Sequence, residues 1–236
     1  MPNPYFKFKQ FTVYHDRCAM KVGTDGVLLG AWAQVDNARR ILDVGTGTGL
    51  IALMTAQRSQ AHIMGIDIDE KAVEQAEENV KASPWKERIC ICRKDVMQMC
   101  REVDGTFDAI VSNPPYFVEN VHCPDARRNV ARHTGDLTFG ELLAAVERLL
   151  ADDGTFSVII PADAADDFIS LAAGKHLYPN RKTLIHTKPD AVPKRVLLAF
   201  GRQICACATE DLVVELERHV YSPAYIRLTK EFYLNM

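Results

Sequence analysis

The sequence lacks a long hydrophobic run and a cysteine framework. No stretch of about eighteen consecutive apolar residues occurs in the 236-residue chain, and residues 1–11 contain no apolar segment typical of a signal peptide. The seven cysteines, an odd number, include no C-x-x-C pair and no complete four-ligand set at zinc spacing. These absences predict a cytoplasmic protein with reduced thiols that neither spans a membrane nor binds a metal.

The sequence also has no excess of positive charge. The formal net charge is −3, so any binding to a nucleic acid must depend on a local basic patch. Hydrophobic residues make up 47% of the chain, which is enough for the core of one α/β domain. Two small domains would also fit this length, but no linker, repeat or low-complexity tract divides the chain. We therefore expect a single domain over residues 1–236.

Strand and helix patterns alternate from residue 40 onward. Short apolar runs that end at glycine, proline or an acid predict strands, and an amphipathic pattern over residues 71–82 predicts a helix. The strands are predicted over residues 40–45, 62–67, 88–93, 107–112, 155–161, 181–187 and 195–201. The last two are joined by the turn "KPDAVPK", which is typical of an antiparallel hairpin. The order predicts an α/β fold with a doubly wound, mostly parallel seven-stranded sheet and an antiparallel C-terminal hairpin.

One helix after the fourth strand has a clear start signal. Thr138 can cap its first turn, and Glu141 can reach back to form a capping box. Leu142, Val146 and Leu149 would then face the core.

A glycine-rich loop, "LDVGTGTGL", follows the first core strand and opens the next helix. Gly45, Gly47 and Gly49 let the backbone pass close to a ligand at the carboxyl end of the sheet. A dinucleotide fingerprint would have a glycine at the sixth position, which is Leu50 here. The G-x-G-x-G spacing, with Asp43 two residues before it, resembles the first motif of S-adenosylmethionine-dependent methyltransferases. The resemblance implies that Asp43 and the three glycines bind this cofactor.

Two acids follow the next strands at the same edge of the sheet. Asp67 ends the second strand, where a carboxylate can accept both hydrogens of a ribose diol in a nicotinamide or an S-adenosylmethionine enzyme. A solvated strand-end acid is the alternative. Asp95 follows the third strand and can accept from an adenine amine, or it can be a simple turn residue.

The stretch "SNPPYF", residues 112–117, ends the fourth strand. Proline cannot donate to a sheet, so the strand must stop there, beside the glycine loop. An Asn-Pro pair can also be an ordinary turn opener. In the amino methyltransferases that the chain resembles, the tetrad [DNS]-P-P-[YFW] holds the amine that receives the methyl group.

The residue types of this corner suit an amine whose lone pair is delocalised into a π system. Two acceptors, the Asn113 side-chain oxygen and the Pro114 carbonyl, would draw such a nitrogen toward a tetrahedral shape without a strong base. Tyr116 would stack on a planar acceptor. Asn113, Pro114 and Tyr116 are therefore the predicted catalytic residues.

Three classes of acceptor use such a corner: bases in DNA, bases in RNA and the glutamine side chain of release factors. Release-factor enzymes carry an N-terminal helical domain, whereas only residues 1–39 precede the first core strand. DNA enzymes usually add a target-recognition domain, and no insertion here is long enough. A protein-glutamine methyltransferase, an enzyme for another RNA or DNA base, and a non-catalytic nucleotide-binding module remain alternatives.

The two ends of the chain favour one class. "FKFKQFTVYHDRCAMKVGTDGVLLGAW", residues 6–32, resembles the opening of the bacterial tRNA1(Val) adenine-N6 methyltransferases, and the tail "SPAYIRLTKEFYLNM" resembles theirs as well. The resemblance implies a Rossmann-like class I fold, S-adenosylmethionine as cofactor and the adenosine at position 37 of tRNA as acceptor. It also implies that residues 1–39 cover the cofactor site and that residues 40–236 form the catalytic core.

The resemblance gives roles to two further groups of residues. Thr24 and Asp25 would open a helix over the methionine end of the cofactor, or simply cap that helix. An RNA backbone would pass over the basic residues after the corner, unless they form a solvated face. These residues are Arg127, Arg128, Arg132 and His133. The expected partner is the anticodon stem-loop region of tRNA, because an unpaired loop base enters a pocket at little cost. The protein is expected to act as a monomer.

Overall fold

The computed structural model of the chain describes residues 3–18, 21–102, 107–114 and 137–236, with side chains described for all of these except residues 101–102. The strands in these ranges are β1 (Tyr5–Lys7), β2 (Thr12–Tyr14), β3 (Arg40–Val44), β4 (His62–Asp67), β5 (Ile89–Arg93), β6 (Phe107–Ser112), β7 (Leu150–Pro161), β8 (Tyr178–His186), β9 (Arg195–Gly201), β10 (Ala208–Val213), β11 (Glu215–Glu217) and β12 (Val220–Tyr221). The α-helices are α1 (Thr24–Trp32), α2 (Leu50–Arg58), α3 (Glu70–Lys81), α4 (Val96–Glu102), α5 (Phe139–Leu149), α6 (Ala165–Ala173) and α7 (Pro223–Thr229).

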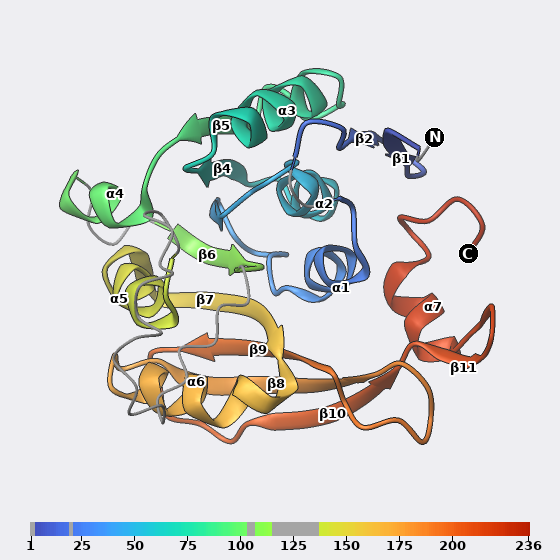
Figure 1. Ribbon diagram of the computed structural model, residues 1–236. Helices are drawn as coiled ribbons and strands as arrows, with labels where there is room; N and C mark the ends of the chain where they lie inside the picture. The colour runs from blue at the N-terminus through green and yellow to red at the C-terminus, as the bar shows by residue number, and fades with distance from the viewer. Residues whose placement is uncertain (1–2, 19–20, 103–106, 115–136) are drawn as a thin grey trace, which may run out of the picture.

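An eight-stranded sheet runs through the middle of the molecule in the order β10-β8-β9-β7-β6-β3-β4-β5 (Figure 1). The five strands from β7 to β5 are parallel to one another. β9 is antiparallel to both of its neighbours, β7 and β8. The predicted doubly wound, mostly parallel sheet with an antiparallel hairpin is confirmed.

The sheet has one strand more than the seven that the sequence predicts. The extra strand, β10, pairs in parallel with β8 at the edge of the sheet. Its sequence, ATEDLV, is largely polar, and only Leu212 is buried. No apolar run or alternation therefore marks it as a strand. Charged side chains on such an edge strand also discourage pairing with another chain.

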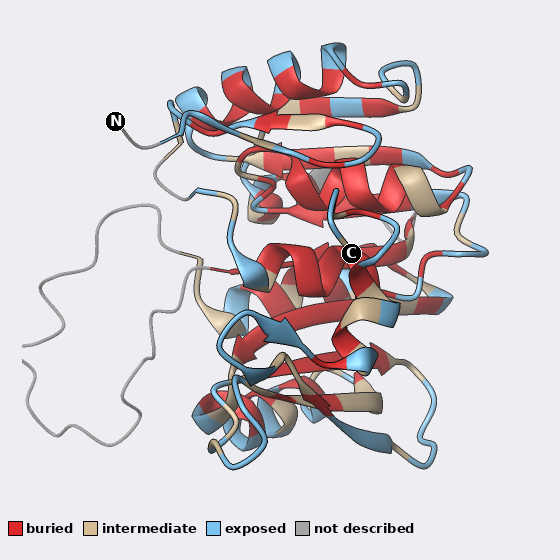
Figure 2. Cartoon of the chain, turned by 90° about the vertical axis from the view of Figure 1, so that its right-hand side faces the viewer, coloured by how far each residue is buried: buried red, intermediate tan, exposed pale blue. Residues whose placement is uncertain are grey.

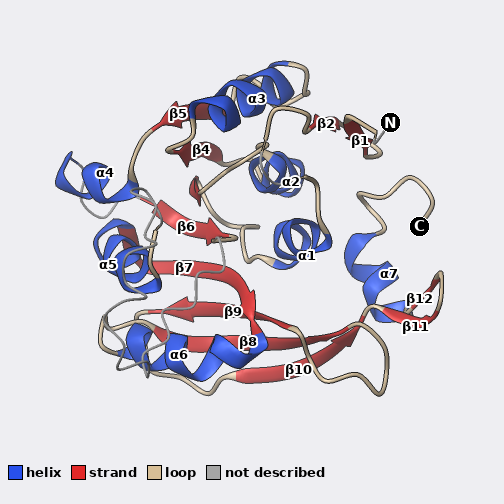
Figure 3. Ribbon diagram, in the orientation of Figure 1, coloured by secondary structure: helices blue, strands red, loops and turns tan. Residues whose placement is uncertain are grey.

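Helices cover both faces of the sheet (Figure 3). Successive strand residues point to opposite faces, so Ile41 packs with α1, α2 and α3 whereas Leu42 packs with α4, α5 and α6. Figure 2 shows the same division on the uppermost helix, α3, which is buried toward the sheet and exposed on its outer side. The core is thus formed by two apolar layers, one on each face of the sheet.

The signals read for two helices agree with the structure. The capping box at the start of α5 is present, because the Glu141 amide donates to Thr138 Oγ1 at 3.2 Å and the Thr138 amide donates to Glu141 Oε2 at 3.0 Å. Leu142, Val146 and Leu149 are buried, as predicted. α3 begins one residue before its predicted start, with Asp69 as its N-cap.

The two ends of the chain pack against each other. The Lys9 amide donates to the Phe232 carbonyl at 2.8 Å, and Phe8 forms an isolated bridge with Tyr233. The rings of Phe8 and Tyr233 stack with their centroids 5.9 Å apart. Figure 1 accordingly shows both termini on the same side of the sheet.

Candidate active site

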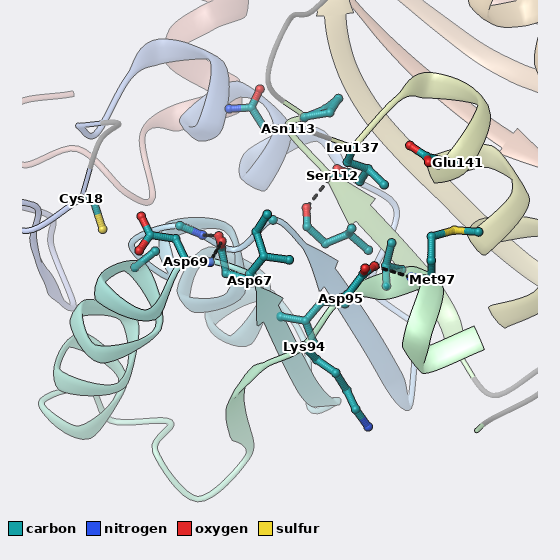
Figure 4. A pocket seen from close by; sticks show the side chains of 18 residues that line it. Cys18, Asp67, Asp69, Lys94, Asp95, Met97, Ser112, Asn113, Leu137 and Glu141 are labelled. Carbon is teal, nitrogen blue, oxygen red and sulfur yellow. Dashed lines mark hydrogen bonds between the residues drawn. The ribbon is translucent and has the colours of Figure 1, made fainter. Parts of the chain in front are cut away.

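A cavity of about 410 Å³ lies at the carboxyl edge of the sheet (Figure 4). Its walls come from the ends of β3, β4, β5 and β6 and from the first turns of α3, α4 and α5. Open α/β sheets bind ligands in this crevice, because the loops that follow neighbouring parallel strands meet there. The volume suits a cofactor-sized molecule.

The glycine loop forms one wall of the cavity. Gly45, Gly47 and Gly49 have φ angles of 71°, 53° and 78°, in the left-handed region that favours glycine. A β-carbon on Gly45 or Gly47 would meet no protein atom within 4 Å, whereas one on Gly49 would lie 3.3 Å from Ala76 Cβ. The first two glycines therefore leave open space for a ligand and line the cavity, and the third allows α2 to approach α3.

Asp67 lines the cavity and also shapes the glycine loop. Its Oδ2 accepts from the Gly47 amide at 2.9 Å, and its Oδ1 accepts from the Asp69 amide at 3.0 Å. Each carboxylate oxygen has a second lone pair. Asp67 can therefore hold the loop and still accept a hydroxyl from a ligand on each oxygen.

Asp43 lies beneath the glycine loop, not on the cavity wall. Its carboxyl is fully buried, and Oδ2 accepts from Thr46 Oγ1 at 2.7 Å and from the Ala52 amide at 3.2 Å. Burial raises the pKa of this carboxyl to about 7, against the opposing effect of these two hydrogen bonds. Asp43 thus fastens the end of β3 to the loop and to α2, and a direct contact with the cofactor remains a prediction.

We expect the free energy of unfolding to fall as the pH rises from about 4 to about 7 because of Asp43. The native carboxyl keeps its proton up to a pH near 7, whereas the unfolded chain loses it near pH 4. In this range the native state binds more protons than the unfolded chain. The free energy of unfolding therefore falls with pH, by up to about 1.4 kcal/mol per pH unit. Asp43→Asn removes this titration. Urea unfolding measures the free energy of unfolding of the wild type and of Asp43→Asn across this pH range. The difference between the two proteins should change with pH, and a constant difference would contradict the raised pKa of Asp43.

Asp95 forms a turn and also lies on the cavity wall, and its contact with an adenine amine remains a prediction. Its Oδ1 accepts from the Met97 amide at 2.8 Å, as in a turn that opens a helix, and the residue also lines the cavity. The apolar side chains of Ile68, Met97 and Leu137 line the cavity as well. They offer the nonpolar surface that a flat heteroaromatic ring requires beside a few placed acceptors.

The Asn-Pro corner lies on the wall of the same cavity as the glycine loop. Ser112, Asn113 and Pro114 all line this cavity. Ser112 is fully buried, and its Oγ donates to the Val44 carbonyl at 2.9 Å across the pair β3–β6. Because Gly45 follows Val44 and Asn113 follows Ser112, this bond joins the start of the loop to the corner. The predicted adjacency of these two motifs is confirmed.

If the corner holds the methyl acceptor, as the resemblance to amino methyltransferases implies, Ser112→Ala should lower the single-turnover rate of methyl transfer at saturating cofactor by about tenfold or more. The Val44 carbonyl would lose its buried donor, and small displacements between reacting groups are costly. Ser59→Ala is the matched control, because Ser59 Oγ donates to the Thr55 carbonyl at 2.8 Å at the far end of α2. Rapid-quench kinetics should show an effect for Ser112→Ala alone, and equal rates for the two variants would contradict this role.

The cavity is acidic. Asp67, Asp69, Asp95 and Glu141 line it, and Lys94 is the one cationic residue among the described lining residues. Figure 4 shows the Lys94 amine directed away from these carboxylates. A site of this kind attracts a ligand that carries positive charge.

The remaining predicted residues lie outside this cavity or outside the described residues. α1 begins at Thr24 as predicted, and the Asp25 carboxylate pairs with Arg195 Nε at 2.8 Å, but neither residue lines the cavity. Their role at the methionine end of a cofactor remains a prediction. The residues outside the described ranges are Tyr116, Arg127, Arg128, Arg132 and His133.

In the part of the chain that the structure describes, no helix is long and apolar enough to cross a membrane. No group of three or more His, Cys, Asp or Glu side chains there is placed to hold a metal ion.

Comparison with known sequences identifies the family. Residues 19–163 match the family described as "Methyltransferase small domain". The chain is 60% identical over 236 residues, the whole of both chains, to the tRNA1(Val) (adenine(37)-N6)-methyltransferase of Phocaeicola vulgatus. The chain belongs to the tRNA1(Val) (adenine(37)-N6)-methyltransferase family. A more distant member, from Pectobacterium carotovorum, is 45% identical over 233 residues and covers 98% of this chain and 94% of its own.

Solved structures agree on the fold of this family member. A predicted O-methyltransferase from Agrobacterium tumefaciens superposes with a TM-score of 0.72 at 20% identity, covering 88% of this chain and 96% of its own. The ribosomal protein L11 methylase of Lactobacillus delbrueckii gives a TM-score of 0.58 at 18% identity, covering 81% and 84%. These similarities show a Rossmann-like methyltransferase fold.

Family membership implies S-adenosylmethionine as the methyl donor, and the cavity fits this molecule. Gly45 and Gly47 leave room on the cavity side, and Asp67 offers two acceptors for a ribose. The surrounding carboxylates suit a sulfonium and an ammonium group.

Several residues that line the cavity were not predicted from the sequence, among them Cys18, Ile68, Asp69 and Met97. Ile68, Asp69 and Met97 could have been found from their places just after strand-end acids, but Cys18 carried no such signal.

Proposed function

We propose that this chain transfers the methyl group of S-adenosylmethionine to N6 of adenosine 37 in tRNA1(Val). The observation that carries the proposal is the Asn113–Pro114 corner on the wall of the same cavity as the glycine loop and Asp67. The names of the full-length relatives support the choice of acceptor.

The residues of the cavity would bind and orient the cofactor. Asp67 would accept from the ribose hydroxyls, the backbone at Gly45 and Gly47 would approach the methionine portion, and Asp95 would accept from the adenine amine. S-adenosylmethionine supplies a methyl group on a positively charged sulfur. The acidic wall favours that charge in the bound state.

The corner would hold and polarise the acceptor. Asn113 Oδ1 and the Pro114 carbonyl accept one hydrogen each from the exocyclic amine. These bonds draw the nitrogen toward a tetrahedral shape, so its lone pair is less delocalised into the ring and is directed at the methyl group. Acceptors fixed in advance stabilise the positive charge that develops on the nitrogen, at no cost in reorganisation. The locked φ of proline fixes the direction of the backbone at this point. No strong base is needed, because water can take the proton that the methylated amine loses.

The RNA partner would be recognised near the anticodon. An adenosine in the anticodon loop is unpaired, so its entry into the cavity costs little stacking energy.

We propose that the chain acts as a cytoplasmic monomer and as one domain over residues 1–236, in which residues 1–39 cover the cofactor site. The packing of Phe8 and Lys9 on Phe232 and Tyr233 supports the single domain, because it joins the two ends of the chain.

The class of acceptor can be tested with S-adenosylmethionine that carries a tritiated methyl group. The purified protein should label total tRNA from a strain that lacks this enzyme, and it should leave release factor unlabelled. Label in release factor would identify a glutamine methyltransferase, and label in neither would indicate a non-catalytic binding module. Either of these results would contradict the proposal.

A further inference from the structure

Helix α3 carries two polar residues on its buried side. Val73, Ala76 and Val80 pack into the core, as the amphipathic pattern predicts. Gln75 and Asn79 lie one helical turn apart, and each is only 1% exposed. Burying an amide costs free energy unless its polar atoms are hydrogen-bonded, so these two side chains need partners from elsewhere in the chain.

Asn79 holds two segments that are distant in the sequence. Its Oδ1 accepts from the Tyr14 amide at 2.9 Å, and its Nδ2 donates to the Tyr14 carbonyl at 2.8 Å. Nδ2 also donates to the carbonyl of Thr48, inside the glycine loop, at 2.9 Å. One buried side chain therefore connects the end of β2 with the cofactor loop.

Gln75 holds the same N-terminal segment from one turn nearer the start of the helix. Its Oε1 accepts from the Arg17 amide at 3.2 Å. The next residue, Cys18, lines the cofactor cavity, and Figure 4 shows its side chain near Asp69. The amides of α3 thus hold residues 14–17 directly before the point where the chain forms part of the cavity wall.

We propose that Gln75 and Asn79 are positioning residues for cofactor binding. They fix the backbone of residues 14–17 on α3, so that Cys18 closes one side of the cavity, and Asn79 fixes the Thr48 carbonyl of the glycine loop. The inference rests on the proposed function only in taking S-adenosylmethionine as the ligand. A protein whose binding-competent form is partly populated loses affinity in proportion to that fraction. Loosening this segment therefore weakens cofactor binding without touching the acceptor corner.

Near-isosteric apolar variants separate this role from a general contribution to stability. Gln75→Met removes the acceptor for the Arg17 amide, and Asn79→Leu removes all three bonds of Asn79. We expect the Kd for S-adenosylmethionine to rise at least about tenfold in each, with little change in the single-turnover rate at saturating cofactor. The matched control is Gln57→Met, because Gln57 Nε2 donates to the Glu231 carbonyl at 2.9 Å and holds the opposite end of the chain. Its Kd should equal that of the wild type.

Amide hydrogen exchange tests the same inference by a second, independent measurement. The Tyr14 and Arg17 amides donate to Asn79 and Gln75, so their exchange reports directly on these bonds. S-adenosylmethionine should slow exchange in a peptide that covers residues 12–18, and Gln75→Met should speed it in the free protein. The inference is overturned if the cofactor leaves exchange in this peptide unchanged, or if Gln75→Met binds the cofactor with the wild-type Kd.

These measurements use calorimetry and exchange with the cofactor alone. A wild-type protein that fails to bind S-adenosylmethionine would contradict the proposed function. A wild-type protein that binds it, with variants that bind it equally well, would contradict the positioning role alone.

Discussion

Asn113→Ala should lower the single-turnover rate of methyl transfer to tRNA by about 10²–10³-fold, the scale for losing one preorganised polar group. Asn113 lines the cavity at the end of β6, where its side-chain oxygen is one of two proposed acceptors for the amine. The glycine loop and Asp67 remain in place in this variant. Calorimetry should therefore give a Kd for S-adenosylmethionine close to that of the wild type, and rapid-quench assays should locate the loss in the chemical step.

Asn113→Asp is the matched control for this prediction. A carboxylate oxygen can accept the same hydrogen bond, so this variant should retain substantial activity, well above that of Asn113→Ala. A wild-type single-turnover rate in Asn113→Ala would show that the corner is only a turn. It would remove the main support for the proposed function.

Asp67→Ala should weaken S-adenosylmethionine binding by roughly 30- to 1,000-fold. Losing a pair of charge-assisted hydrogen bonds to the ribose costs about 2–4 kcal/mol, which corresponds to this range. The structure adds a second cause, because Asp67 Oδ2 also accepts from the Gly47 amide and shapes the loop. Isothermal titration with S-adenosylmethionine measures the effect, and wild-type affinity in Asp67→Ala would refute the assignment.

Asp67→Asn distinguishes the two causes of this loss. The amide keeps one oxygen, which can accept from Gly47 and from one ribose hydroxyl, but its nitrogen can accept neither from the second hydroxyl nor from the Asp69 amide. If the ribose contacts dominate, Asp67→Asn should lose a substantial part of the affinity that Asp67→Ala loses. An affinity near that of the wild type would instead assign Asp67 to the loop alone. Thermal unfolding of both variants checks that the fold is intact.

The fold could be predicted where local pattern and tertiary environment agree. The strands β3, β4 and β6 lead to the glycine loop, to Asp67 and to the Asn-Pro corner. They are largely apolar runs, because helices cover both faces of the sheet. β10 could not be predicted, because its position depends on pairing with β8 and its side chains are largely polar and exposed. Its assignment requires the sheet itself.

The site could be predicted where it follows from strand order. Parallel strands end at one edge, so Gly45, Asp67 and Asn113 were expected to meet, and they line one cavity. The role of Asn79 could not be predicted from the sequence, because this residue contacts Tyr14, which lies 65 residues away in the sequence. Glu141 was predicted as part of a capping box, and its place in the cavity follows from the tertiary packing of α5.

The most direct test of the proposed function compares two tRNA1(Val) transcripts, one with adenosine and one with guanosine at position 37. Each is incubated with the purified protein and S-adenosylmethionine, digested to nucleosides and analysed by mass spectrometry. The proposal predicts N6-methyladenosine in the first digest and none in the second. Equal N6-methyladenosine in both digests, or none in either, would contradict it.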